Sequence, residues 1–260
     1  MTIDDPLLID VNLPLDKLLK NASHEELVVL TDIVTDKGKG RVSLSNEVNK
    51  LLRHHKARHT LHQVTDILAL EICAFGGNTL SNMVRSSKVD YRIVVQDVAK
   101  KLGAKIPKDT SLIKSEELLI QKVLEKVLKD KKSVASIEQF CIQQGIKFDH
   151  TLLEKLKQKG NAAELASFIL NYAGPYAISS LLTAALMSGS GIVLGANWAA
   201  LGVAALNPVI AGLSAIWLTY GLSGPAYRVT IPAVICIATI RQKWCKSLTD
   251  YYCMELKKCL

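Results

Sequence analysis

Apolar residues recur every three or four positions through most of the first 160 residues, with polar and charged residues between them. This spacing places the apolar side chains on one face of a helix, and no stretch keeps the period of two that is typical of a β-strand. The pattern predicts helices over residues 24–35, 45–73, 78–85, 91–102, 115–131, 136–144 and 150–159. The expected fold class is therefore all-α, as a multi-helix bundle.

Local signals support several of these boundaries. Ser23-x-x-Glu26 is a capping-box pattern, which starts a helix because each side chain hydrogen-bonds to the backbone of the other residue. Asp149 is a candidate cap for the helix that follows it, and the glycines at 103, 145 and 160 are expected to end helices. The first 22 residues contain two prolines and are expected to form an irregular arm with one short helix.

A different pattern occupies residues 165–227, where 63 consecutive residues include no Asp, Glu, Lys, Arg or His. Gly189-Ser190-Gly191 divides this run into two apolar halves, and each half exceeds the roughly 20 residues of a bilayer crossing. Small residues at positions 191, 195, 199 and 202 fall on one helical face, where they allow close helix contact. We therefore predict a Gly/Ala-rich apolar helical hairpin in the C-terminal half.

Two environments would suit this hairpin. Lys155, Lys157 and Lys159 precede the run and Arg228 follows it, and basic flanks are typical of the cytoplasmic side of a membrane. Alternatively, the hairpin is a buried core that the amphipathic helices cover in a protein without membrane contact. If the first alternative holds, the protein is associated with a membrane through residues 165–227, on its cytoplasmic side.

Charge and composition divide the chain into four regions. These are a short N-terminal helical module (1–42), a charged amphipathic region (43–160), the uncharged hairpin (161–225) and a basic C-terminal helix (226–260). Residues 1–164 have a net charge of +4, and residues 228–260 have another +4. The expected partner is thus a protein or an anionic membrane surface. No nucleic acid is expected, because aromatic residues are few and no nucleic-acid-binding signature is present.

The start of the chain lacks the basic and apolar pattern of a cleavable signal, so the protein is not expected to be secreted. None of the six cysteines forms a C-x-x-C pair, which fits reduced thiols in the cytosol. His55, His59 and His62 would share one face of the helix predicted over residues 45–73 and are weak candidates for metal binding. The interpretation that we favour is a polar helix surface, so we predict no metal and no cofactor.

One group of polar residues could form a binding site for an anion. An arginine beside a tyrosine is suited to a phosphate or an anionic headgroup. No nucleophile with a partnering base is recognisable, so no catalytic residue is predicted. The alternative role of these residues is to pair with one another and fix the tertiary structure. The candidates are Asn78, Asn82, Arg85, Tyr91, Arg92, Asp97, Tyr227 and Arg228.

Two segments resemble signatures of the bacterial YaaW family. One runs from Phe75 to Asn82 and continues with Tyr91-Arg92 and Asp97–Lys100, and the other is Ala226–Val234. The turn over residues 35–41 also resembles the end of a short N-terminal module in that family. The family is essentially uncharacterised and is grouped at a distance with helical chaperones for the assembly of ubiquinol–cytochrome c reductase. The middle run of this chain is unusually free of charge for the family.

Three hypotheses for function follow. The first is a helical, membrane-proximal interaction or chaperone-like protein without catalysis, which the apolar run, its basic flanks and the resemblance favour. The second is an enzyme or anion-binding protein that uses the Asn/Arg/Tyr residues. The third is a pore-forming or membrane-disrupting protein, in which amphipathic helices shelter the hairpin until a trigger releases it.

Overall fold

The computed structural model describes residues 13–36, 44–76, 90–189, 209 and 227–259, and within them it contains ten α-helices, one 3₁₀ helix and no β-strand. The all-α multi-helix prediction is therefore confirmed. The helices are α1 (Leu15–Lys20), α2 (His24–Thr35), α3 (Asn46–Ala57), η1 (Leu61–Val64), α4 (Thr65–Gly76), α6 (Tyr91–Leu102), α7 (Leu112–Val127), α8 (Lys131–Gln143), α9 (His150–Lys159), α10 (Ala162–Gly189) and α13 (Tyr227–Lys258).

Helix α13 is the element around which the described helices pack. Every residue from Val229 to Gln242 is buried, so this part of the helix has no face exposed to solvent. It contacts α1, α2, α4, α6, α7 and α10. Such a position requires apolar or paired side chains on all sides, which explains why the sequence here shows no amphipathic period.

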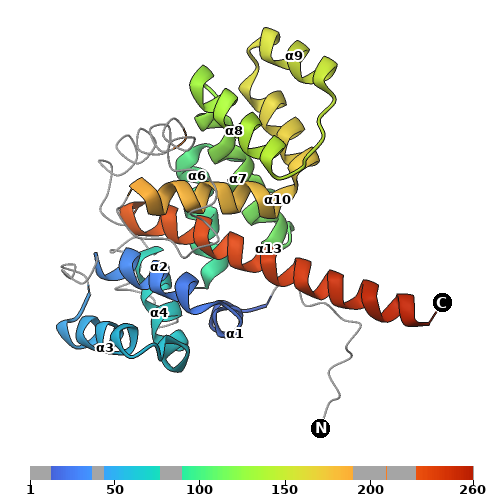
Figure 1. Cartoon of the computed structure of the whole chain (residues 1–260). Coiled ribbons are helices and arrows are strands. Elements are labelled where there is room, and N and C mark those ends of the chain that lie inside the picture. Colours follow the sequence, from blue (N-terminus) through green and yellow to red (C-terminus); the bar gives the residue numbers. More distant parts are fainter. Residues whose placement is uncertain (1–12, 37–43, 77–89, 190–208, 210–226, 260) are drawn as a thin grey trace.

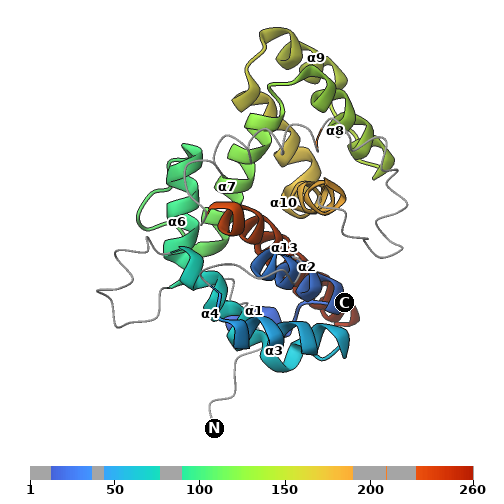
Figure 2. The same ribbon diagram turned by 90° about the vertical axis from the view of Figure 1, so that its left-hand side faces the viewer.

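The other helices form groups on opposite sides of α13. Figures 1 and 2 show α1 to α4 on one side, α10 on the other, and α8 and α9 beyond α10, farthest from α13. Helix α10 packs against both α13 and α7. The last turns of α13 extend past the rest of the molecule in Figure 1. We call residues 245–259 the C-terminal arm.

Helix ends follow the local signals in the sequence. The Ser23 hydroxyl accepts a hydrogen bond from the Glu26 amide at 3.3 Å, and the Glu26 carboxylate accepts one from the Ser23 amide at 2.6 Å. Asp149 caps α9 by accepting from the Leu152 amide at 3.0 Å. Gly103 and Gly160 follow the ends of α6 and α9 with φ of 78° and 67°, a left-handed conformation that glycine adopts without strain. These predictions are confirmed.

The single helix predicted over residues 45–73 is wrong. The chain instead forms α3, the 3₁₀ turn η1 and α4, with a break after Ala57. Arg58 caps α3 and His59 has a positive φ of 58°, which ends the helix and changes the direction of the chain. After this turn Leu61 and Leu68 are completely buried, and this burial favours the break over one straight helix.

Two predicted helices begin earlier than the pattern of apolar residues indicated. Helix α7 begins at Leu112 rather than Ser115, because the Ser111 hydroxyl accepts a hydrogen bond from the Lys114 amide. Helix α8 begins at Lys131 rather than Ser136, because the Asp130 carboxylate accepts one from the Ser133 amide at 2.8 Å. Capping side chains therefore set these boundaries. The helix predicted over residues 78–85 lies outside the described residues.

Helix α10 is the first half of the predicted hairpin, and it bends at Gly174-Pro175. Gly174 has φ 80° and ψ 155°, so two helical segments meet at this residue. Within the described residues, α10 is the one helix long and apolar enough to cross a membrane, and 56% of the window that qualifies is buried. The predicted second half, Ile192–Leu222, lies outside the described residues apart from Val209.

Candidate functional site

The predicted binding residues are divided among several environments. Asn78, Asn82 and Arg85 lie outside the described residues. The other five candidates lie on α6 and at the start of α13, two helices that are in contact.

Tyr91 lies in the interior, beside an ion pair whose two side chains are fully buried. Arg241 of α13 donates from Nε to Oε2 of Glu116 on α7 at 2.9 Å, and both side chains are 0% exposed. The Nη1 of Arg241 donates to the backbone carbonyl of Leu13 at 2.9 Å. One side chain thus connects α13, α7 and the N-terminal segment, and Tyr91 adds α6 to the cluster.

The electrostatics of this cluster are dominated by burial. Burial raises the pKa of Glu116 to about 7, although Arg241 and Tyr91 act in the opposite direction. Burial, reinforced by the Glu116 carboxylate, raises the pKa of Tyr91 well above its usual range. Glu116 Oε1 and the Tyr91 hydroxyl make no hydrogen bond of ordinary geometry among the described residues, although the two side chains affect each other's pKa.

The cluster of Tyr91, Glu116 and Arg241 resembles a structural contact more than a binding site. The side chains are closed off from solvent, and the described hollow on the protein surface is lined by other residues. A substrate would therefore need the core to open before it reached Glu116. The chemistry that the cluster offers is a carboxyl group that exchanges a proton near neutral pH.

Arg92 lies next to Tyr91 in sequence but has a different partner. Its Nη1 donates to the backbone carbonyl of Thr110 at 2.7 Å, and so attaches the segment between α6 and α7 to the start of α6. Its role in the described structure is to position this connection. The predicted binding of an anion by Tyr91 and Arg92 stays a prediction.

Asp97 and Tyr227 are brought together. Burial, with a smaller contribution from Asp97, raises the pKa of Tyr227. Lys101, one turn after Asp97 on α6, places its ammonium 5.0 Å from the centre of the Tyr227 ring. The contact joins α6 to the beginning of α13. Arg228 is exposed beside it.

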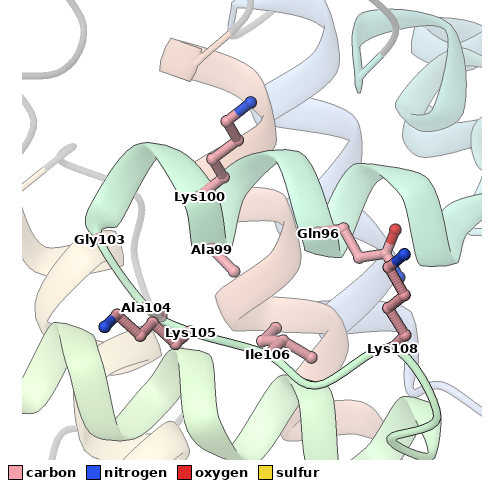
Figure 3. A pocket seen from close by; sticks show the side chains of 8 residues that line it. All are labelled: Gln96, Ala99, Lys100, Gly103, Ala104, Lys105, Ile106 and Lys108. Carbon is pink, nitrogen blue, oxygen red and sulfur yellow. The ribbon is translucent and has the colours of Figure 1, made fainter.

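A surface hollow of about 570 Å³ lies close to this contact, along the C-terminal half of α6 and the segment after it. Figure 3 shows that its lysines diverge: Lys100 and Lys105 point away from each other, and Lys108 lies beside Gln96. Three ammonium groups that bind one anion would have to converge on it. The hollow is therefore basic without being shaped around an anion.

The three candidate histidines do not converge either, because the helix break separates them. His55 Nδ1 lies 2.9 Å from a threonine hydroxyl, and His62 Nε2 donates to the backbone carbonyl of Ala22 at 2.8 Å. The ring of His59 packs against that of His24, with 4.4 Å between their centres. Among the residues that the structure describes, no three His, Cys, Asp or Glu side chains are placed to hold a metal ion.

Sequence reasoning missed Glu116 and Arg241, although the sequence carries a signal for both. Glu116 lies four residues from Leu112 and from Ile120, and Arg241 lies four residues after Ile237, so each charge occupies an apolar stripe. A charged residue on an apolar stripe indicates a buried pair, because a lone buried charge is costly. What the sequence does not reveal is which charge pairs with which.

Comparison with known proteins identifies the family. The UPF0174 protein YaaW of Escherichia coli (strain K12) is 30% identical over 236 residues, which cover 86% of this chain and 92% of that protein. The chain belongs to the UPF0174 (YaaW) family. A UPF0174 protein of Helicobacter pylori (strain J99) is 23% identical over 93% of this chain and 96% of its own length. The resemblance noted in the sequence is thereby confirmed.

Another UPF0174 protein, from Helicobacter pylori (strain 26695), is 29% identical over 68% of this chain. No family model matches the chain, and no solved structure matches it. The UPF0174 family is uncharacterised, and the names of these relatives state no activity. Membership therefore places the chain in a bacterial family, and it assigns no function.

Proposed function

We propose that this protein is a non-catalytic helical binding protein that works beside a membrane, on its cytoplasmic side. The observation that carries the proposal is the run of 63 uncharged residues between the lysines at 155–159 and Arg228. Anionic lipids attract each nearby lysine or arginine by about 1 kcal/mol, so the flanks favour the cytoplasmic leaflet.

The exposure of α10 is consistent with this proposal. Its N-terminal segment is partly uncovered around the bend, where Asn171 and Tyr172 are exposed and the next five residues are half-buried. Tyr172 is 44% exposed and packs against Phe168, an amphipathic arrangement that suits a membrane–water interface. Beyond the bend, Ile178–Leu182 are buried against the core, so the two segments of α10 differ in their surroundings.

Catalysis is left out of the proposed function because no nucleophile with a partnering base is recognisable and two of the candidate residues have structural roles. Arg92 holds a backbone carbonyl, and Tyr91 is enclosed in the core beside Glu116. A partner protein or an anionic lipid surface remains the kind of ligand that the apolar run favours.

Fractionation of cells that express the full chain tests the proposal. We expect the protein in the membrane pellet, and we expect detergent to release it. Protein found wholly in the high-speed supernatant, and unaffected by detergent, would contradict membrane contact.

Vesicle binding separates the alternatives. The full chain is expected to sediment with vesicles of phosphatidylglycerol and phosphatidylethanolamine without releasing an enclosed dye. Replacing Lys155 and Lys159 with glutamine should weaken this binding up to roughly 30-fold at low salt, from the electrostatic contribution of two lysines. Replacing Lys105 and Lys108, on the basic hollow, serves as the control of equal charge. Release of the dye would instead favour a pore-forming protein.

A further inference from the structure

The C-terminal arm carries an apolar stripe whose residues are the same when counted from either end. The spacings are three, four, four and three positions, so all five side chains fall near one face of the helix. Tyr252 is the centre, with a leucine four residues away on each side and a cysteine seven residues away on each side. The stripe consists of Cys245, Leu248, Tyr252, Leu256 and Cys259.

The arm has little support from the rest of the described structure. Lys246 lies 5.5 Å from the centre of the Tyr176 ring, and beyond it the hydrogen bonds and ion pairs of the described arm stay within the helix. Within the stripe, Leu256 is 65% exposed and Cys259 is exposed, while Cys245, Leu248 and Tyr252 are half-buried. Isolated helices of this length are marginal in water, so an apolar face on such a helix calls for a partner.

We propose that two copies of this chain pair through their C-terminal arms, as antiparallel helices with the two-fold axis passing at Tyr252. A two-fold interface joins the same patch on both copies and must therefore be self-complementary. The symmetric stripe meets this condition. In this register Leu248 packs beside Leu256 of the second copy, and Cys245 lies beside Cys259 of the second copy.

Most charges of the arm lie away from the stripe. Lys246, Asp250 and Lys257 fall about 120–160° around the helix from Tyr252, so two arms can meet through their stripes without burying these three charges. Lys246 is directed over the Tyr176 ring of its own chain. Glu255 and Lys258 form an ion pair within the helix at 2.6 Å.

The same charges make a lipid surface the weaker occupant. Residues 245–259 contain three lysines and two acidic residues, which leaves a net charge of +1. Helices that lie on anionic membranes usually carry a basic face, and here Asp250 lies among the lysines.

The N-terminal end of the stripe meets the body of the protein, because Arg241, one turn before Cys245, donates a hydrogen bond to the Leu13 carbonyl. This limits how far a second arm can slide.

The length of the arm sets the expected affinity of the dimer. The helical part of the arm, residues 245–258, spans about 21 Å. One helix of this length buries less than the about 800 Å² per partner of a standard interface, so we expect a dissociation constant in the micromolar range.

Sedimentation of the full chain from about 1 to 200 µM tests the pairing, and we expect a shift from monomer to dimer over this range. Leu248→Lys and Leu256→Lys should each raise the dissociation constant roughly 100-fold, because each buries a charge twice in the interface. Neither leucine belongs to the hydrophobic core or packs against it, so the fold should survive. Ser247→Lys, an exposed position on the opposite face, is the matched control and should dimerise as the parent does.

Crosslinking tests the direction of the arms. In the Cys253→Ser variant, a short bis-maleimide should join Cys245 of one copy to Cys259 of the other, as mapped by mass spectrometry of the tryptic peptides. Parallel arms would instead give Cys245–Cys245 and Cys259–Cys259 products, and that result would overturn the proposed register.

Three further results would overturn the proposal of a second copy. A chain that stays monomeric at 200 µM, with the arm helical by circular dichroism, excludes the dimer. Vesicle binding that Leu256→Lys abolishes in such a monomer assigns the stripe to lipid. Maleimide labelling of Cys259 that increases in the monomer when residues 1–12 are removed assigns the stripe to that segment of the same chain.

Discussion

At the scale of single residues, Arg241 has the largest consequence for the fold. Its guanidinium holds Glu116 on α7 and the carbonyl of Leu13, and no part of the side chain is exposed. A buried pair of this kind adds little over a well-packed apolar pair, but removing one partner leaves an uncompensated charge. The pair therefore makes the packing of α13 specific, because a shift of α13 would separate the charges.

We expect Arg241→Met to lower the free energy of unfolding by about 3–5 kcal/mol at pH 8, because the Glu116 carboxylate then lacks its counter-charge. Adding Glu116→Gln to this variant should recover part of the loss, since the carboxylate is gone. Urea unfolding followed by circular dichroism measures both. The control is Lys114→Met, which breaks an exposed pair with Glu117 and should change stability by less than about 1 kcal/mol.

The pKa of Glu116 gives a separate prediction for pH. In the unfolded chain the carboxyl loses its proton near pH 4.5, whereas burial in the folded protein raises its pKa to about 7. The stability that Glu116 contributes is thus complete below pH 4.5 and declines as the pH rises to about 7. The urea midpoint of the parent should therefore fall relative to that of Glu116→Gln between pH 4.5 and pH 8, on top of the constant loss that the unpaired Arg241 causes in the variant. A constant difference across this range would contradict the raised pKa.

At the scale of elements, the bend in α10 separates a segment with a partly uncovered surface from a segment packed in the core. Gly174 has φ 80° and ψ 155°, a backbone conformation that is nearly exclusive to glycine. Pro175 follows and cannot donate to the preceding turn. The glycine and the proline together let the two segments of α10 take different directions.

Gly174→Ala is expected to cost about 1–3 kcal/mol, because the backbone conformation disfavours any Cβ. A Cβ at this position would meet no atom within 4 Å, so the cost would come from the backbone and not from a clash. Gly160→Ala is the matched control: it is equally open, but its φ of 67° lies in the left-handed helical region, where alanine costs about 1 kcal/mol. Equal losses in thermal melts of the two variants would contradict this explanation.

At the scale of the whole molecule, α13 has two functions in one continuous helix. Residues 229–242 form the centre of the body, and residues 245–259 form the arm beyond it. The body depends on α13 because helices from both sides pack on it, whereas the arm contributes little to the packing. The stability of the fold therefore depends on residues 229–242, and the proposed pairing of two chains depends on residues 245–259.

A truncation separates these parts. The chain ending at Lys246 should unfold cooperatively in urea, with a free energy of unfolding within about 0.5 kcal/mol of the full chain at low micromolar concentration. The chain ending at Arg228 should fail to unfold cooperatively, because it lacks the fourteen buried residues from Val229 to Gln242. Loss of cooperative unfolding in the first truncation would show that the arm supports the body.

Local patterns in the sequence were sufficient to predict much of this fold. The period of the apolar residues predicted the helical class, Ser23 and Asp149 predicted helix starts, and the glycines at 103, 145 and 160 predicted helix ends. These signals act within a few residues and depend on backbone geometry, so they do not need tertiary contacts. The break after Ala57 was not predictable in this way, because the gain comes from burying Leu61 and Leu68 against distant helices.

The sequence by itself determined the helical class, the capped helix ends and the 63-residue run without charge, because each follows from the residue types and their spacing. The tertiary structure alone decided that α13 is central, that Arg241 pairs with Glu116, 125 residues away, and that Tyr91 and Arg92 have different partners. Pairing across such a distance depends on how helices pack in three dimensions. Several arrangements of the same amphipathic helices satisfy the one-dimensional pattern, and only close packing selects among them.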